Sequence, residues 1–306
     1  MRKKCLEMVY ELAKKNKKII FIGSDLGAGV LSNLQKELPN QFFMEGISEQ
    51  FITGMTVGLS KLGFIPYFNT IATFLTRRNF EQNFIGLGLH NSNVRLIGNG
   101  GGFVYAPLGP THLAIEDISI MNSIPNMSII CPSDANEMEH LMRETVNWEG
   151  PIYIRLAKGG DKIISNNIKS FKIGKAITYS SKGPVLLVGT GITTKFALEA
   201  KKKLKKELNC GVIHYNTIAP FDEQTLLKYF KKNETKLIIT IEEHVITGGL
   251  ATLVSEVILK NDLDIKLRSI GIPKKQFIEN YGSQNELLNH YSINSDGLTK
   301  KIKENL

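Results

Sequence analysis

The chain has 306 residues, of which 42% are hydrophobic and 22% are charged. This length suggests two domains that each bury a core, and the composition excludes disordered, collagen-like and disulfide-stapled chains. The net charge is +9, from 38 Lys and Arg against 29 Asp and Glu. Because the lysines form short runs without interleaved aromatic residues, they favour solvated helix faces, and a nucleic-acid function would rest on charge alone.

The sequence also bears on location. No apolar run approaches the roughly 20 residues of a membrane-spanning helix, and no apolar segment follows the basic N-terminus, so we expect no membrane association and no signal peptide. Cys5, Cys131 and Cys210 are widely spaced and form no C-x-x-C pair. We therefore expect free thiols and a cytoplasmic location.

Short apolar runs alternate with amphipathic segments in the first half of the chain. Strands are predicted at 19–22, 64–68, 94–97, 127–131 and 152–156, and helices at 48–62, 74–89, 114–123 and 134–146. Asp134 is the expected N-cap of the last helix, and Glu137 completes a capping box. This alternation predicts parallel β–α units in an α/β sheet.

The composition changes to turn-like residues between about 159 and 184, and a second alternation follows. Strands are predicted at 185–188, 212–214, 237–241 and 265–270, and helices at 193–208, 222–230, 250–259 and 295–304. We therefore predict two consecutive α/β domains, at 1–165 and 181–306, with a linker at 166–180. The first should have a mostly parallel sheet and the second should be smaller.

Three features could carry chemistry. Glu49 begins an apolar, glycine-rich helix, where the helix dipole alone explains a carboxylate, although such a first turn can also face a ligand cleft. The glycine run 98–102 lacks the spacing of a dinucleotide motif and suggests a loop at an active site. His112 follows Gly-Pro-Thr at a loop-to-helix boundary, so it is either a general acid or base or a structural loop residue.

Several motifs occur in the order and at the spacing of one family. They are Gly46-Ile47-Ser48-Glu49-Gln50, Thr73-Phe74-Leu75, Gly109-Pro110-Thr111-His112 and Cys131-Pro132-Ser133-Asp134. This half resembles the pyrimidine-binding domain of transketolase and, similarly, that of 1-deoxyxylulose-5-phosphate synthase. The second half, with Glu242-Glu243-His244, resembles the C-terminal domain of the same family.

The resemblance implies roles for several residues. Glu49 matches the glutamate that binds N1′ of the aminopyrimidine of thiamine diphosphate, and Phe74 matches the aromatic residue that stacks on that ring. Asp25 and Leu26 match a pair near the thiazolium ring. His112 matches a histidine that contacts the hydroxyl of the transferred carbon unit. The implied catalytic residues are therefore Glu49 and His112.

The predicted substrate site departs from the family pattern. Gly100 stands where transketolases have a second histidine, Leu108 stands where they have an acid, and Gly29 replaces a serine. The arginine that binds the substrate phosphate aligns best with Lys158, and Arg155 is nearby. A lysine lacks the bidentate fork of arginine. The resemblance therefore implies intact donor chemistry and an altered acceptor site at Lys158, Arg155, Gly100 and His112.

The family binds the cofactor's diphosphate and Mg²⁺ on a pyrophosphate domain that carries Gly-Asp-Gly followed by Asn, oxygen ligands that suit Mg²⁺. This sequence has no Gly-Asp-Gly, and the nearest match is Ser295-Asp296-Gly297. The resemblance therefore implies the C-terminal subunit of a split transketolase. It predicts no metal ligands on this chain, an N-terminal partner subunit that supplies them, and an α2β2 assembly in which this chain dimerises.

The implied activity is transfer of a two-carbon ketol unit from a ketose or its phosphate to an aldose or related carbonyl acceptor, with small sugars as substrates. Two alternatives stay open: a β subunit of a 2-oxoacid decarboxylating or 1-deoxyxylulose-5-phosphate-synthase-like enzyme, and a non-catalytic assembly partner. The tetrad 109–112 favours ketol transfer. Glu49, Phe74 and His112 argue against a degenerate chain.

Overall fold

The computed structural model describes residues 1–24, 29–273 and 281–306, so Asp25 and Leu26 lie outside the described residues. The chain divides into two compact units. Unit 1 is Met1–Gly101 with Ile120–Ile173, and unit 2 is Gly102–Ser119 with Gly174–Leu306. Residues 102–119, which the sequence placed in the first domain, thus fold with the second half of the chain.

Unit 1 contains a parallel sheet in which the strand order is β5-β6-β4-β3-β1-β2. The strands are β1 (Ile19–Gly23), β2 (Phe42–Met44), β3 (Ile65–Ile71), β4 (Arg95–Asn99), β5 (Ser128–Ile130) and β6 (Ile152–Leu156). Every residue of β1, β4 and β6 is buried, as expected of parallel strands with both faces covered.

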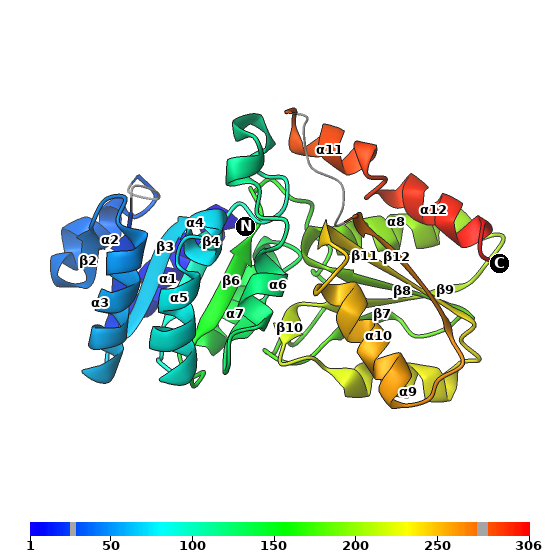
Figure 1. Cartoon of the computed structure of the whole chain (residues 1–306), viewed down its shortest axis with the longest axis horizontal. Coiled ribbons are helices and arrows are strands. Elements are labelled where there is room, and N and C mark those ends of the chain that lie inside the picture. The colour runs from blue at the N-terminus through cyan, green and yellow to red at the C-terminus, as the bar shows by residue number, and fades with distance from the viewer. Residues whose placement is uncertain (25–28, 274–280) are drawn as a thin grey trace. The chain divides into compact units, whose positions relative to one another are not determined.

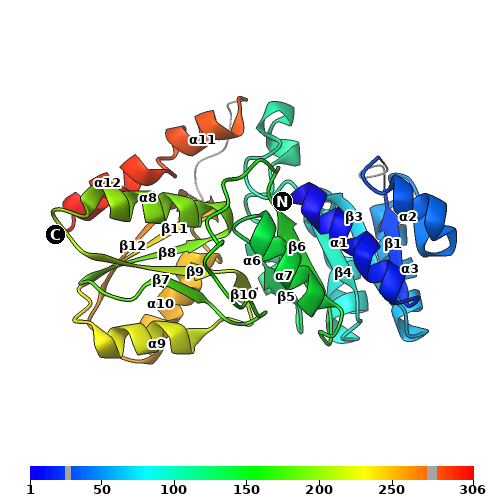
Figure 2. The same ribbon diagram turned by 180° about the vertical axis from the view of Figure 1, so that it is seen from behind.

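Helices cover both faces of this sheet. They are α1 (Arg2–Lys15), α2 (Ser32–Glu37), α3 (Glu49–Lys61), α4 (Ala72–Thr76), α5 (Phe80–Gln82), α6 (Asp117–Asn122), whose residues are divided between the two units, and α7 (Ala135–Thr145). α3 and α5 lie side by side on one face (Figure 1), and α1 packs against α7 on the other (Figure 2). α1, α2 and β2 were not predicted from the sequence.

The predicted helix 74–89 is not continuous. The structure has α4, then α5, and then a π-helical segment at Asn83–Leu89. Asn83 Nδ2 donates to Leu75 O at 2.7 Å, so a side chain takes the place of a backbone donor where α4 ends. Local polar side chains compete with the helix in this way, which periodicity alone does not detect.

Asp134 is the N-cap of α7, as predicted, because its side chain accepts hydrogen bonds from the backbone N–H groups of Asn136 and Glu137. Its bond from Glu137 N is one half of the predicted capping box. Glu137 Oε2 accepts hydrogen bonds from Ser133 N at 2.6 Å and Ser133 Oγ at 2.8 Å. Asp134 Oδ2 also accepts from Ser165 N at 2.9 Å, which ties the segment after β6 to α7.

Unit 2 has a second sheet with strand order β12-β11-β8-β9-β7. The elements are β7 (Ile177–Ser180), β8 (Val185–Thr190), α8 (Thr194–Leu204), β9 (Cys210–Tyr215), β10 (Thr217–Ala219), α9 (Glu223–Lys232), β11 (Leu237–Val245), α10 (Leu250–Lys260), β12 (Lys266–Ile272), α11 (Gln284–His290) and α12 (Ser295–Lys303). The pairs are parallel except β7–β9, which is antiparallel. β7 occupies part of the predicted linker.

Helices α8 and α12 cover one face of this sheet, and α9 and α10 cover the other (Figure 1). The two units confirm the predicted fold class of two α/β domains with mostly parallel sheets. Within the described residues, no helix has the length and apolar character needed to span a membrane.

Candidate functional site

Glu49 is the first residue of α3 and is buried, with 1% of its surface exposed. It shares a face of the helix with the buried residues Ile52, Thr53 and Thr56, because positions three and four apart lie on one side of a helix. The positive end of the helix dipole favours its negative charge. The spacing of the buried residues along α3 therefore places a carboxylate inside unit 1. A buried charge is costly unless it has a partner of opposite charge.

Arg78 is that partner. Its Nη1 lies 2.6 Å from Glu49 Oε2, and its side chain is 41% exposed. Arg78 Cζ also lies over the ring of Phe74, 4.2 Å from the ring centre. Phe74 belongs to α4, which begins directly after β3 ends. A single guanidinium group thus contacts both Glu49 and Phe74, the two described residues that the sequence assigned to the cofactor.

The segment around Arg78 is fixed to α3 by its backbone and by a neighbouring side chain. Gln50 Nε2 donates to Arg78 O at 3.1 Å, and Asn79 Nδ2 donates to Thr53 Oγ1 at 2.9 Å. Sequence reasoning gave Arg78 no role in the cofactor site. The available signal in the sequence was the spacing of four residues between Phe74 and Arg78. In the predicted helix 74–89, that spacing would place an aromatic ring and a cation on neighbouring turns.

Sequence reasoning also missed a buried polar cluster at the carboxyl ends of β1, β3 and β4. Asn99 Nδ2 donates to Asn69 Oδ1 at 2.7 Å and to Thr70 O at 3.0 Å, and Ser24 Oγ donates to Thr70 Oγ1 at 2.8 Å. All four side chains are at most 3% exposed. The carboxyl edge of a parallel sheet is where ligands bind in α/β proteins, and this cluster lies at that edge.

Gly100 and Arg155 lie next to each other in unit 1. Gly100 follows β4 with a φ of +82°, and its N–H donates to Leu156 O at 3.1 Å. A Cβ atom on Gly101 would lie 2.6 Å from Arg155 Cγ, so the Arg155 side chain runs beneath this turn and is only 8% exposed. Lys158 is exposed two residues after the end of β6.

His112 belongs to unit 2, whereas the other described candidates belong to unit 1. It ends a short 3-10 turn at Pro110–His112, and its Nδ1 lies 2.9 Å from Thr111 Oγ1. Gly109, with a φ of +77°, begins this turn and accepts a hydrogen bond from His112 N at 3.0 Å. The glycine is needed because its backbone conformation is unfavourable for other residues.

The segment that carries His112 is anchored to β11 and the residues after it. Phe103 N donates to Glu243 Oε1 at 2.9 Å, Val245 N donates to Ile115 O at 2.8 Å, and Ser119 Oγ donates to Thr247 O at 2.8 Å. These bonds explain why residues 102–119 fold with unit 2. The motif Glu242-Glu243-His244 therefore has a structural use in holding this segment.

The neighbours of Glu243 in that motif are also buried. Glu242 accepts hydrogen bonds from Leu250 N at 2.8 Å and Ala251 N at 2.9 Å, at the start of α10. His244 Nε2 lies 3.9 Å from Asp117 Oδ1, and His244 Nδ1 lies 3.8 Å from Glu242 Oε2. The motif thus joins the start of α6, the end of β11 and the start of α10.

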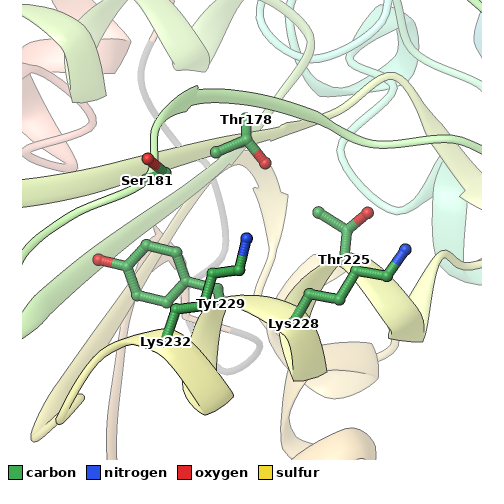
Figure 3. Close-up of a pocket in the computed structure, with 6 residues that line it drawn as sticks. All are labelled: Thr178, Ser181, Thr225, Lys228, Tyr229 and Lys232. Atoms are coloured by element: carbon green, nitrogen blue, oxygen red, sulfur yellow. The ribbon is translucent and has the colours of Figure 1, made fainter.

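A surface cavity of about 240 Å³ in unit 2 contains none of the predicted site residues. Lys228 and Lys232 of α9 line it, together with Thr178, Ser181, Thr225 and Tyr229 (Figure 3). Two of its hydroxyl groups are already used, because Thr225 Oγ1 donates to Asp222 and Tyr229 OH donates to Gly183 O. Across residues 1–24, 29–273 and 281–306, no group of three potential metal ligands occurs.

Comparison with known proteins finds matches for both halves of the chain. Residues 1–160 match the transketolase pyrimidine binding domain, and residues 174–298 match the transketolase C-terminal domain. An apulose-4-phosphate transketolase subunit of Phocaeicola vulgatus is 31% identical over 99% of this chain and 96% of its own length. A 6-deoxy-6-sulfo-D-fructose transketolase subunit of a Clostridium species is 28% identical over 89% of this chain and 84% of its own.

A solved structure of similar length also matches. It is a split gene transketolase, described as an inactive beta4 tetramer, with a TM-score of 0.89 and 28% sequence identity. The match covers 100% of this chain and 97% of that chain. These relatives span nearly the same length as the present chain.

Proposed function

The chain belongs to the transketolase family, as the C-terminal subunit of a split transketolase, and we propose that its unit 1 binds the aminopyrimidine of thiamine diphosphate through Glu49 and Phe74. It is therefore a transferase subunit, and the family depends on this cofactor. The transferred group is a two-carbon ketol unit. We propose a ketose or its phosphate as donor and an aldose or related carbonyl compound as acceptor.

The arrangement of Glu49 and Phe74 is the observation that carries this proposal. Arg78 shows which kind of group these two residues accept. Its guanidinium is planar, donates an N–H to Glu49 and covers the Phe74 ring. An aminopyrimidine is also planar, has a face that can stack, and has a ring nitrogen that can share a proton with a carboxyl group. The residues present therefore fit that half of the cofactor.

Each residue then has a definite task. When bound, thiamine diphosphate would supply a nucleophilic carbon, C2 of its thiazolium ring. Glu49 holds and shares a proton at its carboxyl group, and Phe74 orients the pyrimidine by its ring face. His112, whose ring is fixed through Nδ1 by Thr111, binds the substrate hydroxyl and moves protons there. We also place Asp25 and Leu26 near the thiazolium, by the resemblance alone.

We propose that the acceptor differs from the usual pentose and tetrose phosphates. Arg155 is 8% exposed beneath the Gly100–Gly101 turn, and Lys158 offers a single exposed ammonium group. Leu108 is apolar and 52% exposed. These residues provide fewer charged contacts for a sugar phosphate than a bidentate arginine would.

We propose that the chain dimerises within an α2β2 enzyme. Exposed apolar side chains gather on α3 and its C-cap, on α5 and in the π-helical segment. Their exposed fractions are 65% for Phe51 of α3, 76% for Leu62 at its C-cap, 36% for Phe80 of α5, and 46% and 59% for Ile85 and Leu89 of the π-helical segment. α3 contacts both α5 and the π-helical segment, so these side chains form one apolar face of the kind that a partner covers. The inactive beta4 tetramer of the split gene relative supports both self-association and the need for a second subunit.

We further propose that this second subunit binds the diphosphate and Mg²⁺. To test the proposed function, the chain is combined with a subunit that carries Gly-Asp-Gly and a downstream Asn. The complex should bind thiamine diphosphate with Mg²⁺ in calorimetry and transfer a ketol unit from hydroxypyruvate, and the isolated chain should do neither. A complex that binds no cofactor would overturn the proposal, as would tight binding by the isolated chain.

A further inference from the structure

The contacts of Arg78 have a consequence for cofactor binding. Its guanidinium bonds Glu49 Oε2 at 2.6 Å and lies 4.2 Å from the centre of the Phe74 ring. These are the two residues that the proposed function assigns to the pyrimidine. A side chain and a pyrimidine ring cannot make both contacts at the same time, so one must displace the other.

The Arg78 side chain can move away from Glu49 and Phe74 while its backbone stays in place. Its side chain is 41% exposed, whereas Glu49 is 1% exposed. Its backbone stays tied to α3, because Gln50 Nε2 donates to Arg78 O and the neighbouring Asn79 donates to Thr53 Oγ1. Rotation of the arginine side chain into solvent therefore needs no change in the helices that carry Glu49 and Phe74.

The buried carboxylate explains why an arginine is present. A buried charge without a partner is strongly destabilising, and Arg78 supplies the one charged partner that Glu49 has at 4.0 Å or less among the described residues. In the cofactor-free chain without Arg78, the Glu49 carboxylate would be a buried charge with no partner of opposite charge among the described residues. Arg78 thus neutralises Glu49 and covers Phe74 before the cofactor arrives.

We propose that Arg78 is a placeholder for the aminopyrimidine: it occupies the pyrimidine site of the cofactor-free chain and competes with thiamine diphosphate for Glu49 and Phe74. This inference rests on the proposed function. When the binding-competent state is only partly populated, the apparent affinity falls by that fraction. Arg78 therefore stabilises the cofactor-free protein and weakens cofactor binding.

The test uses the complex with its partner subunit and three variants. Arg78→Ala removes the competitor, Arg78→Gln keeps a neutral donor for Glu49, and Arg77→Ala is the control with the same change in charge on the same segment. The dissociation constant of thiamine diphosphate is measured by calorimetry in Mg²⁺, and the melting temperature is measured with and without the cofactor.

We expect Arg78→Ala to lower the melting temperature of the cofactor-free complex and to tighten cofactor binding about 10- to 100-fold, the range that one charge-assisted hydrogen bond corresponds to. The cofactor should then raise the melting temperature more than in the unmodified complex. Arg78→Gln should fold even if Arg78→Ala does not, and it should bind the cofactor more tightly by a smaller factor. Arg77→Ala should leave the dissociation constant of thiamine diphosphate unchanged.

Unchanged or weaker cofactor binding by the Arg78 variants, with normal binding by the unmodified complex, would overturn the placeholder role and leave the proposed function standing. An unmodified complex that binds no thiamine diphosphate would overturn the proposed function, and the placeholder role with it. The two failures are therefore distinguishable.

Discussion

Glu243 accepts a hydrogen bond from the backbone N–H of Phe103 at 2.9 Å, across 140 positions of sequence. Glu243 is 2% exposed, and its Oε1 also accepts from Gln284 Nε2 at 2.8 Å. A Cβ atom on Gly102 would collide with the carboxyl carbon of Glu243, so only glycine allows this approach. The carboxylate therefore anchors the beginning of the segment that carries His112.

We expect Glu243→Ala to destabilise unit 2 and to loosen residues 102–119, because each buried donor left unpaired costs about 1–3 kcal/mol. Hydrogen exchange should become faster at Phe103 and its neighbours, and kcat of the assembled enzyme should fall. Glu256→Ala changes an exposed glutamate of α10 and is the control. Unchanged exchange in residues 102–119 would contradict the anchoring role.

Glu49→Gln should leave the fold intact and lower turnover by about 10²- to 10⁴-fold, because an amide cannot share a proton with the pyrimidine ring as a carboxyl group does. Turnover is measured with the partner subunit and saturating cofactor. Glu45→Gln, at an exposed glutamate just before α3, is the matched control. Near-normal turnover of Glu49→Gln would reject the assignment.

Phe74→Ala should act mainly on cofactor affinity. The substitution removes a stacking surface, worth about 0.5–1.5 kcal/mol beyond the area it buries, and it removes no proton. We expect the dissociation constant of thiamine diphosphate to rise by at least about 2- to 10-fold, with kcat largely kept at saturating cofactor. Phe43→Ala, at a ring that is 40% exposed on β2 and lies outside the proposed dimer face, should not change the affinity. A large loss of kcat for Phe74→Ala at saturating cofactor would show a different role.

The acceptor should distinguish this enzyme from common transketolases. Each missing charge-assisted hydrogen bond corresponds to about 1.5–3 kcal/mol, so we expect ribose 5-phosphate and erythrose 4-phosphate to be poor acceptors. Hydroxypyruvate should still serve as donor. A coupled assay across acceptors measures both. Efficient use of ribose 5-phosphate would show that other residues, such as Arg77 or Arg78, bind the phosphate.

The cysteines should be unreactive in the folded protein. Burial raises the pKa of the Cys5 thiol from 9.0 to about 12 and that of Cys210 to about 11. Because the thiolate is the reactive form, iodoacetamide at about pH 8 should modify neither residue in the native chain and both in urea. Mass spectrometry of the alkylated protein measures this, and rapid modification of native Cys5 would contradict its burial.

The same shifts predict a loss of stability in alkali. The folded state favours the protonated thiols, whereas the unfolded chain ionises them near pH 9, so their contribution is complete below about pH 9 and is lost as the pH rises towards 11 to 12. The free energy of unfolding of Cys210→Ala should fall less steeply between about pH 8 and 10 than that of the unmodified chain.

The sequence alone determined the family and the two α/β units, because short motifs and local periodicity report which residues follow one another. It also nominated Glu49, Phe74 and His112 for the site, and those assignments stay predictions. It did not show that the predicted helix 74–89 is interrupted, since that depends on the bond from Asn83 to Leu75 O. Nor did it show that residues 102–119 fold with unit 2.

The tertiary structure decided how these residues are paired. Arg78 lies 29 positions from Glu49, and Glu243 lies 140 positions from Phe103, so no local pattern links them. The sequence also gave no sign that the Arg155 side chain runs beneath the Gly100–Gly101 turn. A charge that is removed from water needs a partner within the protein. Only the folded chain shows which residue that partner is.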